Sequence, residues 1–286
     1  MIKERGEIMK KAILVISFGT SHLDTIEKTI DKVEGKIAET FKEYDVFRAF
    51  TSHMIIRALD KKYGIKINKP EEVLDNLYRE GYKEIVIQPL HIISGEEFDY
   101  IKNVVRIYKQ NFEILRLSRP LLYFENEEEK DYTSFINALD TFLPKSEGYV
   151  LVGHGTFHSS FATYGCLQNI LSENDKENFL IGTIEGYPSV DNVIKRLRRL
   201  NIKDITLVPF LLVAGDHAKN DIAGDDEDSW KSILKANGFN VNVFLHGLGE
   251  FEAIWDMYIN HLRETIDGKV LGKGETKKGA KVLCTQ

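Results

Sequence analysis

The chain alternates short apolar runs, rich in β-branched residues, with longer stretches in which apolar residues recur every three or four positions. The short runs are typical of buried strands and the longer stretches of amphipathic helices. Because alternating strands and helices build βαβ units, the pattern predicts an α/β protein with mostly parallel sheets. We expect strands at Ala12–Ser17, Val46–Ala49, Glu84–Gln88, Glu113–Arg116, Tyr149–Val152, Phe179–Thr183, Ile205–Pro209 and Val241–Phe244.

The helical pattern is clearest in four stretches. In residues 24–41, Ile26, Ile30, Val33 and Ile37 fall on one helical face, which predicts a single amphipathic helix after the first strand. The other three helices are expected within residues 70–81, 189–201 and 251–266.

The two halves of the chain resemble one another. The SFGT sequence at 17–20 follows the first strand, and GHGT at 153–156 follows the first strand of the second half, 136 residues later. The segment 87–97 likewise resembles 207–217, at an offset of 120 residues. Any two βαβ units share some features, but two matches in the same order favour a duplication.

The repeat predicts two similar α/β lobes that face each other across a cleft. We assign residues 10–125 to the first lobe, 148–266 to the second and the stretch from 126 to 148 to linker material. Residues 267–286 are rich in Gly and Lys and have no apolar period, so we expect a flexible tail.

Composition narrows the class of protein. Of the 286 residues, 43% are hydrophobic and 29% charged, as in ordinary globular proteins. The formal net charge of −6 gives no overall attraction to nucleic acid or anionic membranes, so neither is expected as a partner. The first apolar run is too short for a signal sequence or a membrane span, and Cys166 and Cys284 form no metal-binding pair. These features favour a cytoplasmic protein.

Three residues that follow strands of the second half are candidates for chemistry. His154, Glu185 and His217 each stand just beyond a predicted strand. The carboxyl ends of parallel strands meet at one edge of a sheet, where their loops line a crevice. Two neutral imidazoles and a carboxylate suit first-row divalent metals, so the three residues predict a metal site.

Other histidines have simpler interpretations. A single histidine after a strand is commonly a structural hydrogen-bonding residue, and only the parallel placement of three candidates favours a metal site. His158 is a possible supporting partner but lies in a helix-forming stretch, and His91, within an apolar run, is expected to be structural.

Several long motifs resemble those of the anaerobic cobalt chelatase family, CbiK. The resemblance covers residues 10 to 266. Its motifs include, in order, KKAILVISFGTS at 10–21, GYKEIVIQPLHIISGEE at 81–97, GHGTFH at 153–158, IEGYPSVD at 184–191 and LVPFLLVAGDHAKNDIAGDD at 207–226. The sequence departs from the family at HGLGEFEA (246–253), which lacks the expected Asn-Pro, and in its lysine-rich tail.

The resemblance implies a lyase-type metal chelatase with a ferrochelatase-like fold. Such an enzyme places Co²⁺ into sirohydrochlorin, or into precorrin-2, on the anaerobic route to cobalamin. Position by position, the resemblance places metal ligands at His154, Glu185 and His217, and a further functional glutamate at Glu97. It implies a tetrapyrrole and a divalent metal as the partners, no cofactor beyond the substrate metal, and a possible homo-oligomer.

The chemistry of metal insertion suggests roles for these residues. Imidazoles can replace the water of an ion without retaining it as a thiolate would, and a histidine can accept a proton near neutral pH. We therefore interpret His154 as a ligand and candidate base, His217 as a ligand, and Glu185 as a ligand or proton acceptor. Arg48 and Arg57 are expected at the cleft rim, where they would meet the substrate's carboxylates.

Alternatives remain open at this point. Phe18, Phe50 and Tyr187 follow strands and could pack against the macrocycle, although aromatic residues there commonly belong to the core. The same site could insert iron or nickel, and the cleft could belong to a tetrapyrrole or metal carrier without catalytic activity. A dinucleotide-binding enzyme is disfavoured because the G-x-G-x-x-G spacing is absent after the strands.

Overall fold

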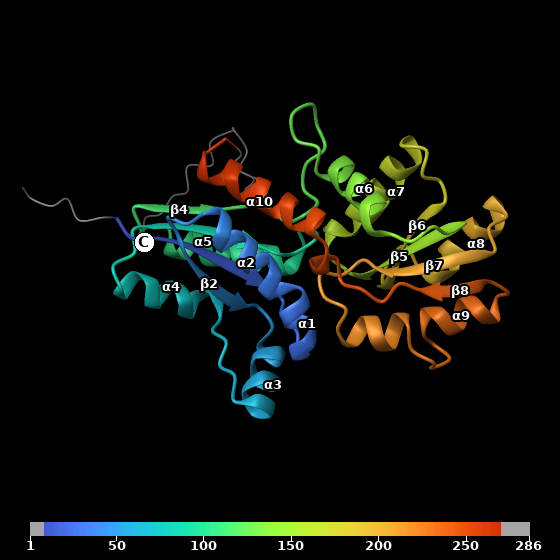
Figure 1. Ribbon diagram of the computed structural model, residues 1–286, viewed down its shortest axis with the longest axis horizontal. Coiled ribbons are helices and arrows are strands. Elements are labelled where there is room, and N and C mark those ends of the chain that lie inside the picture. The colour runs from blue at the N-terminus through green and yellow to red at the C-terminus, as the bar shows by residue number, and fades with distance from the viewer. Residues whose placement is uncertain (1–8, 270–286) are drawn as a thin grey trace, which may run out of the picture.

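The computed structural model, which describes residues 9–269, contains two α/β lobes, each built on a four-stranded parallel sheet (Figure 1). The first sheet has the order β2-β1-β3-β4, with strands β1 (Lys11–Ser17), β2 (Asp45–Phe50), β3 (Glu84–Pro89) and β4 (Ile114–Leu117). The second has the order β6-β5-β7-β8, with strands β5 (Gly148–Gly155), β6 (Phe179–Glu185), β7 (Asp204–Pro209) and β8 (Asn240–Val243). All eight predicted strands are confirmed, and the corresponding strand orders agree with the repeat seen in the sequence.

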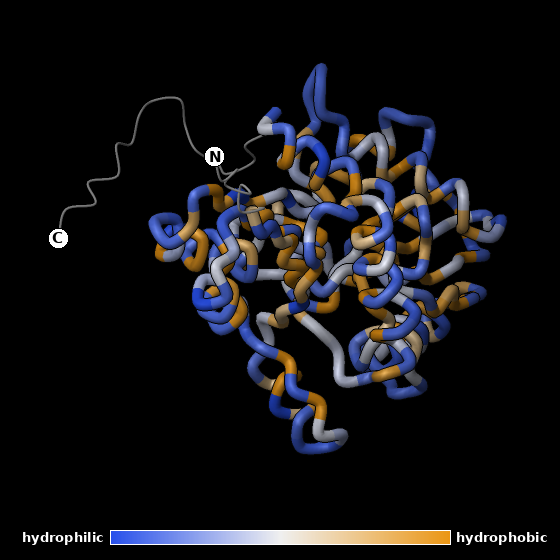
Figure 2. Tube along the Cα trace, turned by 60° about the vertical axis from the view of Figure 1, so that its left-hand side comes forward, coloured by the Kyte–Doolittle hydropathy of each residue, from blue (hydrophilic) through white to orange (hydrophobic). Residues whose placement is uncertain are grey.

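Helices cover both faces of each sheet, with polar residues concentrated in the outer loops (Figure 2). The first lobe contains α1 (Leu23–Lys28), α2 (Ile30–Thr40), α3 (His53–Tyr63), α4 (Pro70–Arg79) and α5 (Glu96–Tyr108). The rest of the described chain adds α6 (Asp131–Phe142), α7 (Ala162–Glu173), α8 (Val190–Leu200), α9 (Trp230–Ala236) and α10 (Glu252–Ile266), with short 3₁₀ turns η1 (Ser159–Phe161) and η3 (Leu248–Glu250) and a π turn η2 (Ala218–Ile222). None of the helices between residues 9 and 269 is long and apolar enough to cross a membrane.

The single helix predicted over residues 24–41 is divided in two at Thr29. This residue has φ −122° and ψ −78°, outside the helical region, and its hydroxyl donates a hydrogen bond to the carbonyl oxygen of Thr25 at 2.5 Å. The break changes the direction of the chain but keeps the apolar face together. The four residues predicted on that face are all buried: Ile26, Ile30, Val33 and Ile37.

The prediction of linker material at residues 126–148 is wrong, because α6 fills most of this stretch. Its buried residues Tyr132, Phe135, Ile136 and Leu139 follow the spacing of an amphipathic helix. The ring of Phe135 packs against that of Phe210, with 5.3 Å between the ring centroids. The helix therefore belongs to the hydrophobic core.

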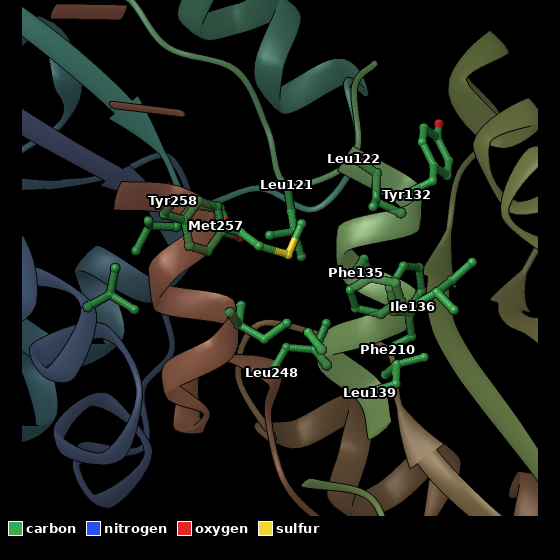
Figure 3. Packing of buried hydrophobic residues seen from close by; sticks show 14 of the residues in the cluster. Leu121, Leu122, Tyr132, Phe135, Ile136, Leu139, Phe210, Leu248, Met257 and Tyr258 are labelled. Atoms are coloured by element: carbon green, nitrogen blue, oxygen red, sulfur yellow. The ribbon is translucent and has the colours of Figure 1, made fainter. Parts of the chain in front are cut away.

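One hydrophobic cluster joins the two lobes (Figure 3). It runs from β1 and β3 of the first sheet, through α6 and α10, to β5 and β7 of the second. Helix α10 follows the second lobe in sequence but packs against α2, β3 and β4 of the first, as Figure 1 shows. The chain thus passes between the lobes twice. Only residues 267–269 of the predicted tail fall within the described part of the chain, so its flexibility stays a prediction.

A buried network of charged side chains lies where the chain passes between the lobes. Arg119, which follows β4, donates hydrogen bonds to both carboxylate oxygens of Asp131 at the start of α6, each at 2.9 Å. His261 and Glu264 of α10 complete the network, at 3.0 Å from Asp131 and 2.6 Å from Arg119. Burial raises the pKa of Asp131, but the bonds from His261 and Arg119 outweigh it and lower that pKa to about 2.

Candidate active site

A cavity of about 620 Å³ lies between the lobes, at the carboxyl ends of both sheets. Its walls come from the last residues of β5 and β6, the segments that follow β1, β3, β5 and β7, the start of α3, and Tyr164 of α7. The four predicted site residues all line it: Glu97 from the first lobe, and His154, Glu185 and His217 from the second. The loops at the carboxyl ends of the parallel strands therefore bring these side chains to one cavity, as expected from the sequence.

Backbone geometry fixes the turn that carries His154. Gly155 has φ +91°, and a Cβ atom at this position would stand 1.7 Å from the carbonyl oxygen of Glu185. Only glycine therefore fits between β5 and β6 here. The amide of Gly155 donates a hydrogen bond to the hydroxyl oxygen of Tyr164 at 3.1 Å. Gly19, 136 residues earlier, has φ +92°, so the two halves share this turn.

His154, Glu185 and His217 approach one another at the cavity wall. The ring centroids of the two histidines are 4.6 Å apart, with the rings nearly perpendicular at 85°. Nε2 of His154 is 3.5 Å from Oε1 of Glu185. The three side chains are 43%, 44% and 54% exposed in the order His154, Glu185, His217, so an ion or a large ligand can reach them.

Each imidazole is oriented through its Nδ1 atom. Nδ1 of His217 is 2.6 Å from Oδ2 of Asp221, one helical turn later. Nδ1 of His154 is 3.2 Å from the carbonyl oxygen of Gly155. Both partners only accept hydrogen bonds, so a neutral imidazole that makes this bond carries its proton on Nδ1 and presents the lone pair of Nε2 to an ion. Such partners are typical of metal-binding histidines.

The three side chains are not yet arranged to bind one metal ion together. Among residues 9–269, no group of three or more His, Cys, Asp or Glu side chains is arranged to hold a metal ion as it stands. A single ion bound by His154, Glu185 and His217 therefore requires their side chains to turn toward a common point.

The other candidate histidines have different surroundings. His158 faces Asp99 of the first lobe, with 3.3 Å between Nε2 and Oδ2, instead of supporting His154. Burial lowers the pKa of His91 to about 4, and neither ring nitrogen has a hydrogen-bond partner among the described residues. His91 also lines the cavity, which its place in an apolar run did not indicate.

The expectation for Arg48 is wrong, and Phe50 belongs to the core, the commoner alternative for aromatic residues at this position. Arg48 is not available to a ligand because its guanidinium pairs with Glu34 and Asp31. Phe50 is fully buried and packs behind Gly19, where it occupies the space that a larger residue would need. Phe18 does line the cavity, Tyr187 is exposed outside it, and Arg57 is exposed on α3. The described lining contains no lysine or arginine.

Sequence reasoning missed the residues that position the candidate ligands. Asp221 could have been found from its spacing of four residues from His217, which places two helical side chains together. The role of Tyr164 depends on how α7 packs under β5, where its ring stands 2.7 Å from the position of a Cβ on Gly153. No local pattern indicates that contact.

Comparison with known proteins gives one consistent family. The family model described as cobalt chelatase (CbiK) matches residues 11–267. The sirohydrochlorin cobaltochelatase of Salmonella typhimurium is 42% identical over 262 residues, which cover 91% of this chain and 97% of that protein. The sirohydrochlorin cobaltochelatase CbiKC of Nitratidesulfovibrio vulgaris is 30% identical, over 90% of this chain and 91% of its own.

Solved structures support the fold. SirB from Bacillus subtilis, in a structure with Fe³⁺, has a TM-score of 0.62 at 17% identity, over 91% of this chain and 98% of its own. The sirohydrochlorin chelatase SirB from Bacillus subtilis subspecies spizizenii, in complex with cobalt, has a TM-score of 0.59 at 14% identity, over 91% of this chain and 97% of its own. The two-lobed α/β architecture is therefore that of known chelatases.

Proposed function

Because the chain belongs to the cobalt chelatase (CbiK) family, we propose that it is a sirohydrochlorin cobaltochelatase, which inserts Co²⁺ into sirohydrochlorin. The observation that carries the proposal is the meeting of two imidazoles and a carboxylate in the cavity between the lobes. These residues lie in the motifs through which the sequence resembles the family.

Metal insertion has to balance protons as well as bonds. The free tetrapyrrole carries two pyrrole N–H groups, and Co²⁺ enters as both protons leave and four ring nitrogens bind the ion. In this proposal the Nε2 atoms of His154 and His217 replace water on the incoming Co²⁺, because their lone pairs face away from the Nδ1 partners. The ion is a substrate, so the ring nitrogens finally replace the imidazoles.

The carboxylates of the cavity suit the two proton transfers. Glu185, 3.5 Å from Nε2 of His154, can accept a proton directly or stabilise an imidazolium on His154. Glu97 extends from the first lobe into the same cavity. A ring held between the lobes would meet the candidate ligands on one wall and Glu97 on the other, so protons could leave from either face.

The proposal extends to the setting of the reaction. We propose sirohydrochlorin and a divalent metal as the only partners of the site, with precorrin-2 as an alternative tetrapyrrole. Insertion of iron or nickel is the second candidate activity, because two histidines and a carboxylate bind all three ions. A cytoplasmic location and a homo-oligomer stay predictions.

Substitution of His217 tests the role of the site. We expect His217→Ala to reduce metallation at least tenfold while sirohydrochlorin still binds, because the ring has many contacts and the ion few. The measurements are metallation rates over a cobalt series and a titration with sirohydrochlorin. Partial recovery of the rate at high cobalt indicates ligation, and no recovery indicates proton acceptance.

The matched control is His246→Ala, since His246 is also exposed and paired with a carboxylate but does not line the cavity. If His217→Ala keeps the wild-type metallation rate at low cobalt, His217 is not part of the site. A wild-type protein that binds sirohydrochlorin one to one without changing its metallation rate would instead be a carrier.

A further inference from the structure

Two contacts bridge the lobes beside the cavity, and neither is used in the mechanism above. In the first, His22 follows β1 and reaches the segment after β7. Its Nε2 atom is 2.8 Å from Oδ1 of Asp216, and its Nδ1 atom is 3.3 Å from Nζ of Lys219. The two segments also pack closely, because a Cβ on Gly215 would stand 3.2 Å from Oγ1 of Thr20. We call this contact the first bridge.

The second bridge runs in the opposite direction. His158, after β5 in the second lobe, has its Nε2 atom 3.3 Å from Oδ2 of Asp99, in the first turn of α5 in the first lobe. Close packing accompanies it too, because a Cβ on Gly95 would stand 3.3 Å from Oγ of Ser160. Within α5, Nζ of Lys102 also contacts Oδ1 of Asp99, at 2.5 Å.

The two bridges occupy corresponding positions in the repeat. His22 and His158 are 136 residues apart, the same offset that relates SFGT to GHGT. Gly95 and Gly215 are 120 residues apart, the offset of the second pair of matching segments. The two histidines therefore correspond in the repeat, as do the two glycines, whereas the aspartates do not, because Asp216 and Asp99 are 117 residues apart.

Hydrogen-bond partners give both histidines the same tautomer. An ammonium group only donates, so Nδ1 of His22 accepts from Lys219 and Nε2–H donates to Asp216. The amide of Ser160 donates to Nδ1 of His158 at 3.2 Å, which places the proton of a neutral ring on Nε2, the atom that contacts Oδ2 of Asp99 at 3.3 Å. The donor at Nε2 is therefore the atom through which each bridge acts.

The bridges are attached to the segments that carry the candidate metal ligands. Asp216 immediately precedes His217, and His158 follows His154 by four residues. We propose that His22 and His158 are positioning residues: each holds one imidazole-bearing segment against the opposite lobe, and together they set the separation between the two walls of the cavity. What the cavity holds rests on the proposed function, but the bridges do not depend on it.

The bridges are weak enough to break and reform. The side chains of His22 and His158 are 30% and 28% exposed, and their aspartates 64% and 42%. Pairs this accessible to water are individually weak, so each can break without unfolding the protein. When a bridge breaks, the two cavity walls can move apart locally while the shared core keeps the lobes together, and the reformed bridge restores the positions of the ligands.

The test compares alanine with glutamine at both histidines. Alanine removes the donor, whereas the amide of glutamine can place an N–H near the position of Nε2. Spin labels at Lys61 of α3 and Lys235 of α9, both exposed, report the distance between the lobes. The labels are introduced as Lys61→Cys and Lys235→Cys in a full-length chain from which Cys166 and Cys284 are replaced by serine.

We expect one narrow distance distribution in the parent protein, a broader one that extends to longer distances in His22→Ala and His158→Ala, and a return to the narrow one in His22→Gln and His158→Gln. Titration with Co²⁺ alone, followed by its visible absorption, should weaken about two- to fivefold in each alanine variant and less in the glutamine variants. Each single variant keeps the other bridge, so folding is retained.

Unchanged distances and cobalt titrations in both alanine variants would overturn the proposal. Glutamine variants as impaired as the alanine variants would also overturn it, because they would show that the imidazole ring and not its donor matters. Neither measurement involves turnover. A wild-type protein that fails to metallate sirohydrochlorin would therefore contradict the proposed function and leave the result on the bridges intact.

Discussion

At the level of single residues, the candidate ligands differ in what orients them. His154 donates its Nδ1 proton to a backbone carbonyl, which no side-chain substitution removes. His217 donates to the carboxylate of Asp221, which is half-exposed on the π turn. The orientation of His217 is therefore the one that a substitution can test.

We predict that Asp221→Asn weakens the binding of Co²⁺ about 10- to 100-fold, the effect typical of removing a partner that orients a metal-binding histidine. The metallation rate should fall at low cobalt and recover as cobalt rises. Both quantities are measured by titration of the free protein and by rates over a cobalt series. Asp225→Asn is the matched control, because Asp225 is exposed and pairs only with Lys231 among the described residues. Equal cobalt binding by the two variants would show that Asp221 does not act on a ligand.

The residue-scale predictions from sequence depended on where strands end. His154, Glu185 and His217 could be selected because each follows a buried apolar run, and parallel strands bring such positions together. The contacts of His22 and His158 could not be selected, because they depend on how the two lobes dock. Arg48 was misassigned because its ion-pair partners lie on α2, and the sequence does not show which helix covers β2.

At the level of elements, the junction between the lobes depends on the buried network of Arg119, Asp131, His261 and Glu264. We predict that Asp131→Asn lowers the free energy of unfolding by about 3–5 kcal/mol, because it leaves the buried Arg119 with only Glu264 as an anionic partner in the network. Urea unfolding measures the change. Asp140→Asn is a suitable control, since the carboxylate of Asp140 is half-exposed in its pair with Lys176. A loss below about 1 kcal/mol, as for a surface pair, would contradict the role of the network.

The same carboxylate predicts how stability depends on pH. The pKa of Asp131 is about 2 in the folded protein and about 3.9 in an unfolded chain, so the folded state binds this proton less readily. Its contribution, on the order of 2 kcal/mol, is present above pH 4 and is lost as the pH falls toward 2. Urea unfolding of the wild type between pH 5 and 2 should show this loss, and Asp131→Asn should lack it. Parallel pH profiles for the two proteins would contradict the assignment.

The elements themselves were predictable where the local pattern was strong. The strands β1, β3, β5, β6 and β7 are largely buried and give continuous apolar runs, and the less buried β2, β4 and β8 still carry short β-rich runs, so all eight were found. Helix α6 was missed because the polar stretch from Glu125 to Lys130 precedes it and resembles a linker. The break at Thr29 was missed because a threonine is compatible with a helix, and no local pattern indicates its non-helical φ of −122° and ψ of −78°.

The end of α10 marks where the chain can be shortened. We predict that truncation after Ile266 leaves metallation and thermal stability nearly unchanged, because the following Gly- and Lys-rich sequence has no apolar periodicity. Truncation before Glu252 should instead prevent folding, because it removes Met257, Tyr258 and Leu262 from the shared core. Circular dichroism and thermal unfolding distinguish the two. Unfolding of the chain truncated after Ile266 would contradict the prediction.

At the level of the whole molecule, duplication gives two lobes with one shared core and unequal sides to the cavity. The second lobe supplies both candidate imidazole ligands and Glu185, whereas the first supplies Glu97, the buried His91 and apolar surface such as Phe18. An ion can therefore be held at one wall while the opposite wall holds the ring. This division of roles follows from the sequence differences between two similar lobes.

The central claim is that these residues insert cobalt into sirohydrochlorin, and a metal-competition assay tests it most directly. Purified protein is given sirohydrochlorin with Co²⁺, Fe²⁺ or Ni²⁺, and the absorbance of the tetrapyrrole is followed for the wild type, His154→Ala and His217→Ala. We predict that the wild type accelerates cobalt insertion well above the protein-free rate and that each variant loses most of this acceleration. Acceleration with iron or nickel but not with cobalt would contradict the assignment of the metal, and equal rates in wild type and variants would contradict the site.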